Sequence, residues 1–169
     1  MRFTVILSVI FISTQALSEN TSTGTNALLN NTTGSKNVAV GDSAMKNNTS
    51  GLNNTVVGYF GLRNSTSGKQ NTAIGSYSLR NNTTGDDNTA VGFESLKYNT
   101  TGDKNTAVGN YALQDNTSGT SNTSIGNYAL SDNTVGDKNT AVGNYSMRSN
   151  SSGNDNTSVG NYAMRDNTS

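Results

Sequence analysis

The residue types that carry most enzyme chemistry are missing from this sequence. Its 169 residues contain no His and no Cys. A catalytic-triad base, an imidazole metal ligand, a thiolate nucleophile and a disulfide framework are therefore all excluded. The many serines have no base beside them in any recognisable motif, so we also reject hydrolase chemistry. We expect a protein that is not an enzyme and that uses no cofactor.

Aspartates are the remaining candidates for metal ligands. They recur in short polar segments at Asp86, Asp87, Asp103, Asp137 and Asp155. Carboxylate oxygens suit calcium, but the Gly-Gly-x-Gly-x-Asp pattern of calcium-binding rolls is absent. We therefore expect no metal site.

Asparagine offers a regularly spaced candidate for modification. Asn-x-Ser/Thr sequons, the acceptor motif for N-linked glycans, recur at one phase of the sequence: Asn31, Asn48, Asn82, Asn99, Asn116, Asn150 and Asn167. Identical Asn residues that stack along a fibre axis can instead hydrogen-bond to one another, and Asn also favours turns. The pattern favours a structural ladder and leaves glycosylation open as the alternative.

A second ladder is aromatic. Tyr77, Tyr111, Tyr128, Tyr145 and Tyr162 share one phase, and Phe60 extends the series. Stacked rings are a possible ligand face for sugars or protein, although packing between coils is the more common role. Basic residues follow three positions later, at Lys46, Arg63, Arg80, Lys97, Arg148 and Arg165. We expect them to form a solvated edge that discourages lateral aggregation.

These residues share phases because the chain is one repeat. From Asn20 onward it divides into 17-residue units without an insertion or deletion. The units begin at Asn20, Asn37, Asn54, Asn71, Asn88, Asn105, Asn122, Asn139 and Asn156. Eight are complete and the ninth stops at its fourteenth residue, Ser169. A short fixed period predicts a solenoid, and we number positions within the unit from 1 to 17.

Glycine recurs at two positions of this unit. Position 15 carries Gly in eight units, and position 5 carries it in every unit. After the first unit the position-5 glycines are Gly41, Gly58, Gly75, Gly92, Gly109, Gly126, Gly143 and Gly160. Fixed phases indicate backbone sites that need a positive φ or a close approach of two chain segments. They argue against disorder, which the composition alone (31% hydrophobic, 13% charged) would suggest.

Between the glycines the unit has two strand-like segments, one ending in Val or Ile at position 4 and one carrying Leu or Met at position 9. We predict an all-β fold, a parallel β-roll or β-solenoid whose coils stack about 4.8 Å apart. Each 17-residue coil has only about two large side chains to bury. This thin core predicts a homo-oligomer.

The N-terminus has the features of a secretory signal. Arg2 precedes an apolar run of about ten residues from Phe3 to Ile12, and Ala16 and Ser18 occupy the small positions before a cleavage site. The run is too short for a spanning helix of about 20 residues. We therefore predict a signal peptide at 1–18, a repeat domain at 19–169, a secreted or cell-surface protein, and no membrane span in the mature chain.

The unit resembles a known family. Its pattern Asn-Thr-Ala-Val-Gly-x-Tyr-Ala-Leu-x-x-Asn-Thr-Ser/Thr-Gly is similar to the head repeats of YadA-like trimeric autotransporter adhesins and to repeats of phage tail fibres. The resemblance implies a left-handed, trimeric β-roll. It also implies an interior lined by positions 4 and 9, which include Val40, Val91, Val108, Ile125, Val142, Leu79, Leu96, Leu113 and Leu130. The coiled-coil stalk and β-barrel anchor of the adhesins are absent, which indicates a fragment or a filament whose ends pair.

Function follows from the resemblance and the composition. We expect an adhesin-like head or fibre shaft in surface attachment, whose partners are other copies of the chain and a host surface protein or glycan. The alternatives are a structural, glycan-coated extracellular filament and, at lower weight, an ice-binding protein. The 11 Lys and Arg residues balance the 11 Asp and Glu residues, so we expect no nucleic-acid partner.

Overall fold

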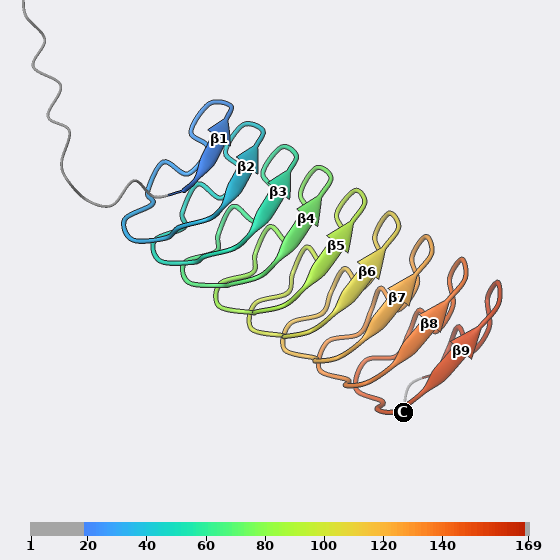
Figure 1. Ribbon diagram of the computed structural model, residues 1–169. Helices are drawn as coiled ribbons and strands as arrows, with labels where there is room; N and C mark the ends of the chain where they lie inside the picture. Colours follow the sequence, from blue (N-terminus) through green and yellow to red (C-terminus); the bar gives the residue numbers. More distant parts are fainter. Residues whose placement is uncertain (1–18, 168–169) are drawn as a thin grey trace, which may run out of the picture.

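The computed structural model describes residues 19–167, which form a stack of coils with one short strand in each (Figure 1). The strands are β1 (Thr21–Thr23), β2 (Val38–Val40), β3 (Thr55–Val57), β4 (Thr72–Ile74), β5 (Thr89–Val91), β6 (Thr106–Val108), β7 (Thr123–Ile125), β8 (Thr140–Val142) and β9 (Thr157–Val159). No helix occurs within residues 19–167. The predicted signal peptide, residues 1–18, lies outside the described residues.

The nine strands form one parallel sheet in chain order. Each strand pairs with the next in a register of 17 residues, so that Thr106 lies beside Thr123 and Val108 beside Ile125. Figure 1 shows the strands side by side from blue to red, as expected when one complete turn of the chain separates each pair. The predicted all-β parallel β-solenoid is therefore confirmed. Because the register equals the period, the same unit position stacks on itself along the whole rod.

Only one of the two expected strands forms in each coil. The segment around position 9 is a series of turns, in which positions 7 and 9 both have positive φ, as at Tyr111 (φ 59°) and Leu113 (φ 51°). A left-handed conformation costs a side-chain-bearing residue roughly 1 kcal/mol. Hydrogen bonds to the next coil offset this cost, for example from Leu113 N–H to the carbonyl of Ala129 at 3.0 Å. The turns thus pair between coils as regularly as the strands do.

The interior is built from positions 3 and 9. Ala107 at position 3 and Leu113 at position 9 are completely buried. The other fully buried side chains at position 9 are Met45, Leu62, Leu79, Leu96, Leu130 and Met147. Ala, Val or Ser at position 3 gives each coil a thin apolar layer, with one large side chain facing one small one.

Position 4 does not line the interior of a single chain. Successive side chains of a strand point to opposite faces, so burial of position 3 turns positions 2 and 4 outward. Val108 and Ile125 are 37% and 41% exposed, and Val40, Val91 and Val142 are half-buried. The implied core placement of these five residues is therefore wrong for the isolated chain.

The two glycine positions allow neighbouring coils to approach closely. Gly109 at position 5 has a φ of 133°, and a Cβ added there would overlap the carbonyl of Gly126 in the next coil. Gly102 at position 15 lacks this unusual φ, but a Cβ there would overlap the Gly119 carbonyl and the Asn99 side chain. Position 5 therefore needs Gly for its backbone angle and its contact, and position 15 for its contact alone.

Candidate functional site

Asparagine at position 1 forms a buried ladder along the rod. The backbone N–H of Asn54 donates to Oδ1 of Asn37 at 3.0 Å, and that of Asn71 donates to Oδ1 of Asn54 at 2.9 Å. Each side chain also reaches across its own coil, as Asn54 Nδ2 donates to the Gly68 carbonyl at 2.9 Å. Because a buried polar group without a partner costs about 1–3 kcal/mol, these bonds explain why Asn is tolerated inside. Position 1 therefore forms one hydrogen-bonded Asn ladder inside the rod.

Position 12 is a second internal ladder, and this finding corrects the glycosylation hypothesis. Asn116 Nδ2 donates to Asn99 Oδ1 at 2.7 Å and to the Gly119 carbonyl at 2.9 Å. An amide nitrogen that is enclosed and bonded in this way cannot carry a glycan in the folded chain. The sequon residues that are fully buried in this way are Asn48, Asn82, Asn99, Asn116 and Asn150. For these five the structure has the structural placement that the sequence favoured, and not the exposed amide that the glycosylation alternative requires.

The two end members of that set are less enclosed. Asn31 and Asn167 are half-buried. Asn31 Nδ2 still donates to the Gly34 carbonyl at 2.9 Å, and Asn167 Nδ2 donates to Asn150 Oδ1 at 3.3 Å. Both therefore continue the position-12 ladder toward the ends of the rod.

The acidic turn residues accept backbone hydrogen bonds between coils. Oδ1 of Asp86 accepts from Lys69 N–H, Oδ1 of Asp103 from Asp86 N–H, and Oδ1 of Asp137 from Thr120 N–H, each at 2.7 Å. Within residues 19–167 no three acidic side chains gather closely enough to hold a metal ion. These aspartates therefore act as turn acceptors in the geometry described.

The aromatic residues at position 7 stack as a ladder. The rings of Tyr111 and Tyr128 lie 4.5 Å apart at an interplanar angle of 15°, and those of Tyr128 and Tyr145 lie 5.1 Å apart at 4°. Tyr162 continues the stack at 5.1 Å and is 48% exposed. Partial burial and the neighbouring phenols raise the pKa of Tyr128. The sequence-predicted aromatic ladder therefore exists in the folded chain.

Tyr77 is separated from this stack because its coil is followed by one that has Glu94 at position 7. Phe93 fills the gap, with its ring 6.2 Å from that of Tyr77 and 5.4 Å from that of Tyr111. Tyr77 stacks instead on Phe60, at 5.6 Å and 13°. The predicted ligand face is therefore two ring systems joined by one edge-on ring.

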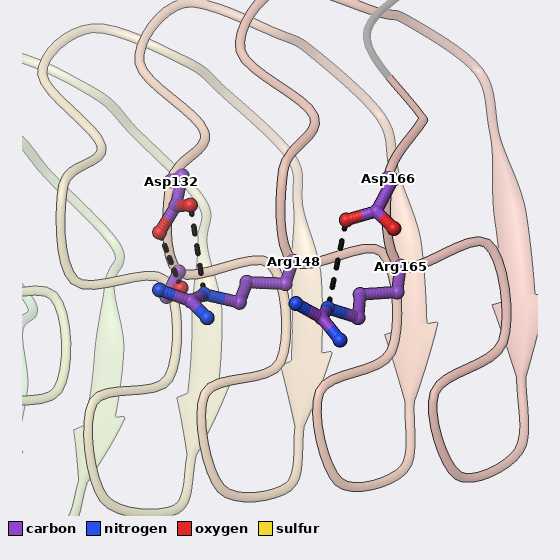
Figure 2. Close-up of polar contacts among 5 residues, drawn as sticks. Asp132, Arg148, Arg165 and Asp166 are labelled. Atoms are coloured by element: carbon purple, nitrogen blue, oxygen red, sulfur yellow. Dashed lines mark hydrogen bonds and ion pairs between the residues drawn. The ribbon is translucent and has the colours of Figure 1, made fainter.

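Every basic residue at position 10 except Lys46 lies over an aromatic ring, and all but Arg165 are half-buried. Toward the C-terminus they are paired with acids: Arg148 Nε lies 3.6 Å from Asp132 Oδ2, and Arg165 Nε lies 3.5 Å from Asp166 Oδ1 (Figure 2). The guanidinium carbon of Arg148 is 5.8 Å from the ring centroid of Tyr128 and 5.7 Å from that of Tyr145. Arg148 therefore has both an acid and two rings as neighbours, and Arg165 likewise has Asp166 and the Tyr162 ring.

Lys97 marks the middle of the basic series. Its Nζ lies 3.0 Å from Glu94 Oε2, and the same carboxylate oxygen accepts from Gln114 Nε2 at 2.7 Å. Burial disfavours the charged lysine, but hydrogen bonds with Glu94 and Tyr98 outweigh this and raise the pKa of Lys97. The ammonium group is therefore held in place by partners of its own chain.

The outer face of the sheet is a different surface. Position 2 carries Thr in every strand except β2, and position 4 carries Val or Ile in every strand except β1. No charged residue occurs in any of the nine strands. Within the strands the most exposed apolar side chains are Val159 at 70%, Val57 at 42%, and Ile74 and Ile125 at 41%. We call this surface the Thr/Val stripe.

Sequence reasoning missed the Thr/Val stripe as a surface. The signal was present, because a strand that alternates Thr, Ala and Val with the small residue in the middle can only bury one of its two faces. The small residue at position 3 suits the narrow space inside the coil, opposite the large side chain at position 9.

Comparison with protein-family models gave no match, and comparisons with curated proteins and with solved structures gave no significant similarity. In the part of the chain that the structure describes, no helix is long and apolar enough to cross a membrane. The candidate surfaces for function are the Thr/Val stripe and the aromatic and basic ladders.

Proposed function

We propose that this chain is an exported, non-enzymatic β-solenoid that serves as an adhesin-like head or fibre shaft in surface attachment. Several copies assemble through the Thr/Val stripe, and a trimer is the arrangement that the resemblance to YadA-like heads favours. The remaining faces of each chain then point outward to a host surface protein or glycan.

The observation that carries this proposal is the Thr/Val stripe. Large β-branched side chains on a solvent-facing sheet are a hallmark of interaction sites when they form a continuous patch. Here they recur in register in eight of the nine strands, with no charge among them. Full burial of one such side chain stabilises an assembly by roughly 1.5–3 kcal/mol.

A second copy of the chain is the partner that fits this stripe best. Its side chains repeat with the strand spacing of about 4.8 Å, and a long partner must match that spacing to stay in register. Another copy presents the same rows with the same spacing over its whole length. Symmetric homo-oligomers are also the commonest form of soluble assembly.

The thin interior supports the same proposal. Most coils enclose one fully buried large side chain together with Ala or Ser, and the remainder of the interior is the two Asn ladders. Hydrogen bonds contribute only about 1 kcal/mol each in net terms. Burial of the Thr/Val stripe between copies adds the apolar contact that a single coil lacks.

The proposal is tested by the mass of the protein in solution. Sedimentation equilibrium of the chain from residue 19 onward should give a multiple of the monomer mass, with three as the expected number. The double substitution Val108→Lys and Ile125→Lys places two charges in the stripe and should yield a folded monomer. Val135→Lys is the control, since Val135 is likewise an exposed apolar residue, at 50%, but lies at position 14, outside the strands.

A wild-type chain that sediments as a monomer at all concentrations would contradict assembly, and so would dissociation by V135K to the same extent. Attachment is tested separately, by coating beads with wild-type or V108K/I125K protein and counting beads retained on extracellular matrix. Multivalent wild-type protein should hold the beads more strongly than the monomer. Equal retention to an albumin coat would contradict an attachment role.

A further inference from the structure

The zero net charge of this chain conceals an uneven distribution along the rod. The units that hold β2, β3 and β4, residues 37–87, contain four basic residues, Lys46, Arg63, Lys69 and Arg80, and three acids, two of which (Asp86 and Asp87) lie at the end of the third unit. Residues 88–169 contain seven acids and five bases. The first region therefore has a small net positive charge, and the region that follows has a small net negative charge.

Three of the four basic residues form one column. Lys46, Arg63 and Arg80 occupy position 10 of three consecutive coils, so they lie one above another at about the strand spacing of 4.8 Å. The guanidinium carbon of Arg63 is 4.8 Å from the centroid of the Phe60 ring, and that of Arg80 is 5.5 Å from that of Tyr77. These contacts hold the two guanidinium groups against the rod. We call these three residues the basic column.

The basic column lacks the acids that accompany the later arginines. Among residues 19–167 the side chains of Lys46, Arg63 and Arg80 form no ion pair, and those of Arg63 and Arg80 form no hydrogen bond. Their Nε atoms are enclosed without a hydrogen-bond partner, as is that of Arg148, so the difference from Arg148 lies in the missing acid. The one nearby acid in sequence, Asp42, accepts through Oδ1 from the backbone N–H of Thr25 in the preceding coil, at 2.8 Å.

The residues beside the column explain the difference. Arg148 pairs with Asp132, the position-11 residue of the preceding coil. The equivalent neighbours of Arg63 and Arg80 are Asn47 and Asn64, whose amides bond to each other at 3.2 Å. A neutral amide ladder has thus replaced the carboxylates, and the N–H groups at the outer ends of both guanidinium groups remain available to an external acceptor.

We propose that the basic column binds a linear acidic polysaccharide, through sulfate or carboxylate groups that lie on successive cations. The column is straight and narrow, which suits a chain carrying anions at intervals along its length. The ring of Tyr59, 46% exposed and 5.5 Å from the Tyr77 ring, supplies an apolar face beside it for a sugar ring. Nucleic acid is the poorer occupant, because its affinity depends on neutralising many phosphates over a broad basic surface.

This inference rests on the proposed attachment role and names the class of ligand that the surface would take. It involves position 10 and not the Thr/Val stripe, so its test does not depend on assembly. A protein that assembles and attaches but fails to bind the polysaccharide would contradict this inference alone.

The experiment is a titration of fluorescein-labelled heparin oligosaccharide with the wild-type chain, followed by anisotropy at pH 7. An ionic strength of about 0.01 M keeps the charges unscreened. Arg63→Gln with Arg80→Gln should weaken binding about tenfold or more, since each substitution removes charge-assisted hydrogen bonds. Arg148→Gln with Arg165→Gln is the matched control and should leave the affinity within about twofold, because those arginines already have acidic partners.

A second variant tests whether the positive charge of Arg63 and Arg80 must be unpaired, by adding acids beside them and leaving both arginines in place. Asn47→Asp with Asn64→Asp places carboxylates beside Arg63 and Arg80 as Asp132 lies beside Arg148, and it should weaken binding by a similar factor. Undetectable binding by the wild type would overturn the proposal, as would equal losses in the two arginine pairs. Binding of single-stranded DNA of equal charge as tightly as heparin would overturn the choice of polysaccharide.

Discussion

The coils of β2–β4 and those of β7–β9 have the same interior and different surfaces. Leu62 and Leu130 are both completely buried, and the position-1 Asn ladder runs through both regions. The position-12 ladder is interrupted in the first region by Ser65. Outside, position 11 is Asn in the first region and mostly Asp in the second, so Arg80 has no acidic partner while Arg148 does. The stacking of the coils thus restricts which residue types can occupy the inward-facing positions of the unit, and it does not restrict those at the outward-facing positions. Surface chemistry can therefore change from coil to coil without repacking.

The strongest test of a shared interior is glycine replacement in both regions. A Cβ at Gly58 or at Gly126 would overlap the carbonyl of the position-5 glycine in the next coil, and both residues have positive φ. We expect Gly58→Ala and Gly126→Ala each to destabilise the fold by about 4 kcal/mol or more. The midpoint of urea unfolding, at fixed protein concentration, gives the measurement.

Gly160→Ala is the control for this test. Gly160 has the same kind of φ, 130°, but the nearest atom to an added Cβ is the Ala163 Cβ at 3.6 Å. It should cost clearly less than the other two. Equal losses in all three variants would show that the backbone angle, not contact between coils, makes glycine necessary.

A smaller effect is expected from cavities in the two regions. Leu62→Ala and Leu130→Ala each remove a fully buried side chain, and we expect about 3 kcal/mol of destabilisation in both. Met164→Ala, at the same position but 43% exposed, should cost less than about 1 kcal/mol. A difference of more than about 1 kcal/mol between the destabilisation of the two Leu variants would contradict the equivalence of the two interiors.

The surface difference is sharpened by making the second region resemble the first. Asp132→Asn removes the acidic partner of Arg148, so we expect a gain of about two- to fivefold in heparin affinity with little change in stability. Asp155→Asn removes an acid from an exposed turn and serves as the control. Equal gains in both variants would indicate an effect of overall charge instead of a specific pair.

The smallest effect concerns Asp115. Burial raises its pKa, the Asp132 carboxylate adds to the shift, and Lys97 opposes it. Because the pKa in the folded state is above the ordinary value of 3.8, ionisation penalises folding as the pH rises from that value through the folded pKa. We expect Asp115→Asn to stabilise the chain by about 0.5 kcal/mol or less at pH 7, given its solvent exposure.

This advantage should vanish below pH 3.8, where wild-type Asp115 is protonated in both states. Unfolding curves of the two proteins at pH 7 and at the lower pH provide the measurement. An unchanged difference between them at both pH values would contradict the assignment.

Much of the fold follows from the repeat in the sequence. The unbroken 17-residue period gave the register, and the recurrent Asn and Tyr residues gave the ladders. The face of position 4 was predicted wrongly as the interior of the single chain, because Val and Ile are common both in a core and at an interface between chains. The burial of Asn116 was not predicted either, since its sequon reads the same whether the amide is enclosed or exposed. Only the path of the turns, with positive φ at Tyr111 and Leu113, decides which way these side chains point.

The constant register also has a consequence for the gene. Every coil contacts only the one before it and the one after it, so its surroundings are the same wherever it stands in the array. A recombination event that adds or removes whole units keeps both the reading frame and the pairing. Rod length can thus change within a population in single steps, and a charged coil can be copied or moved along the rod together with whatever it binds.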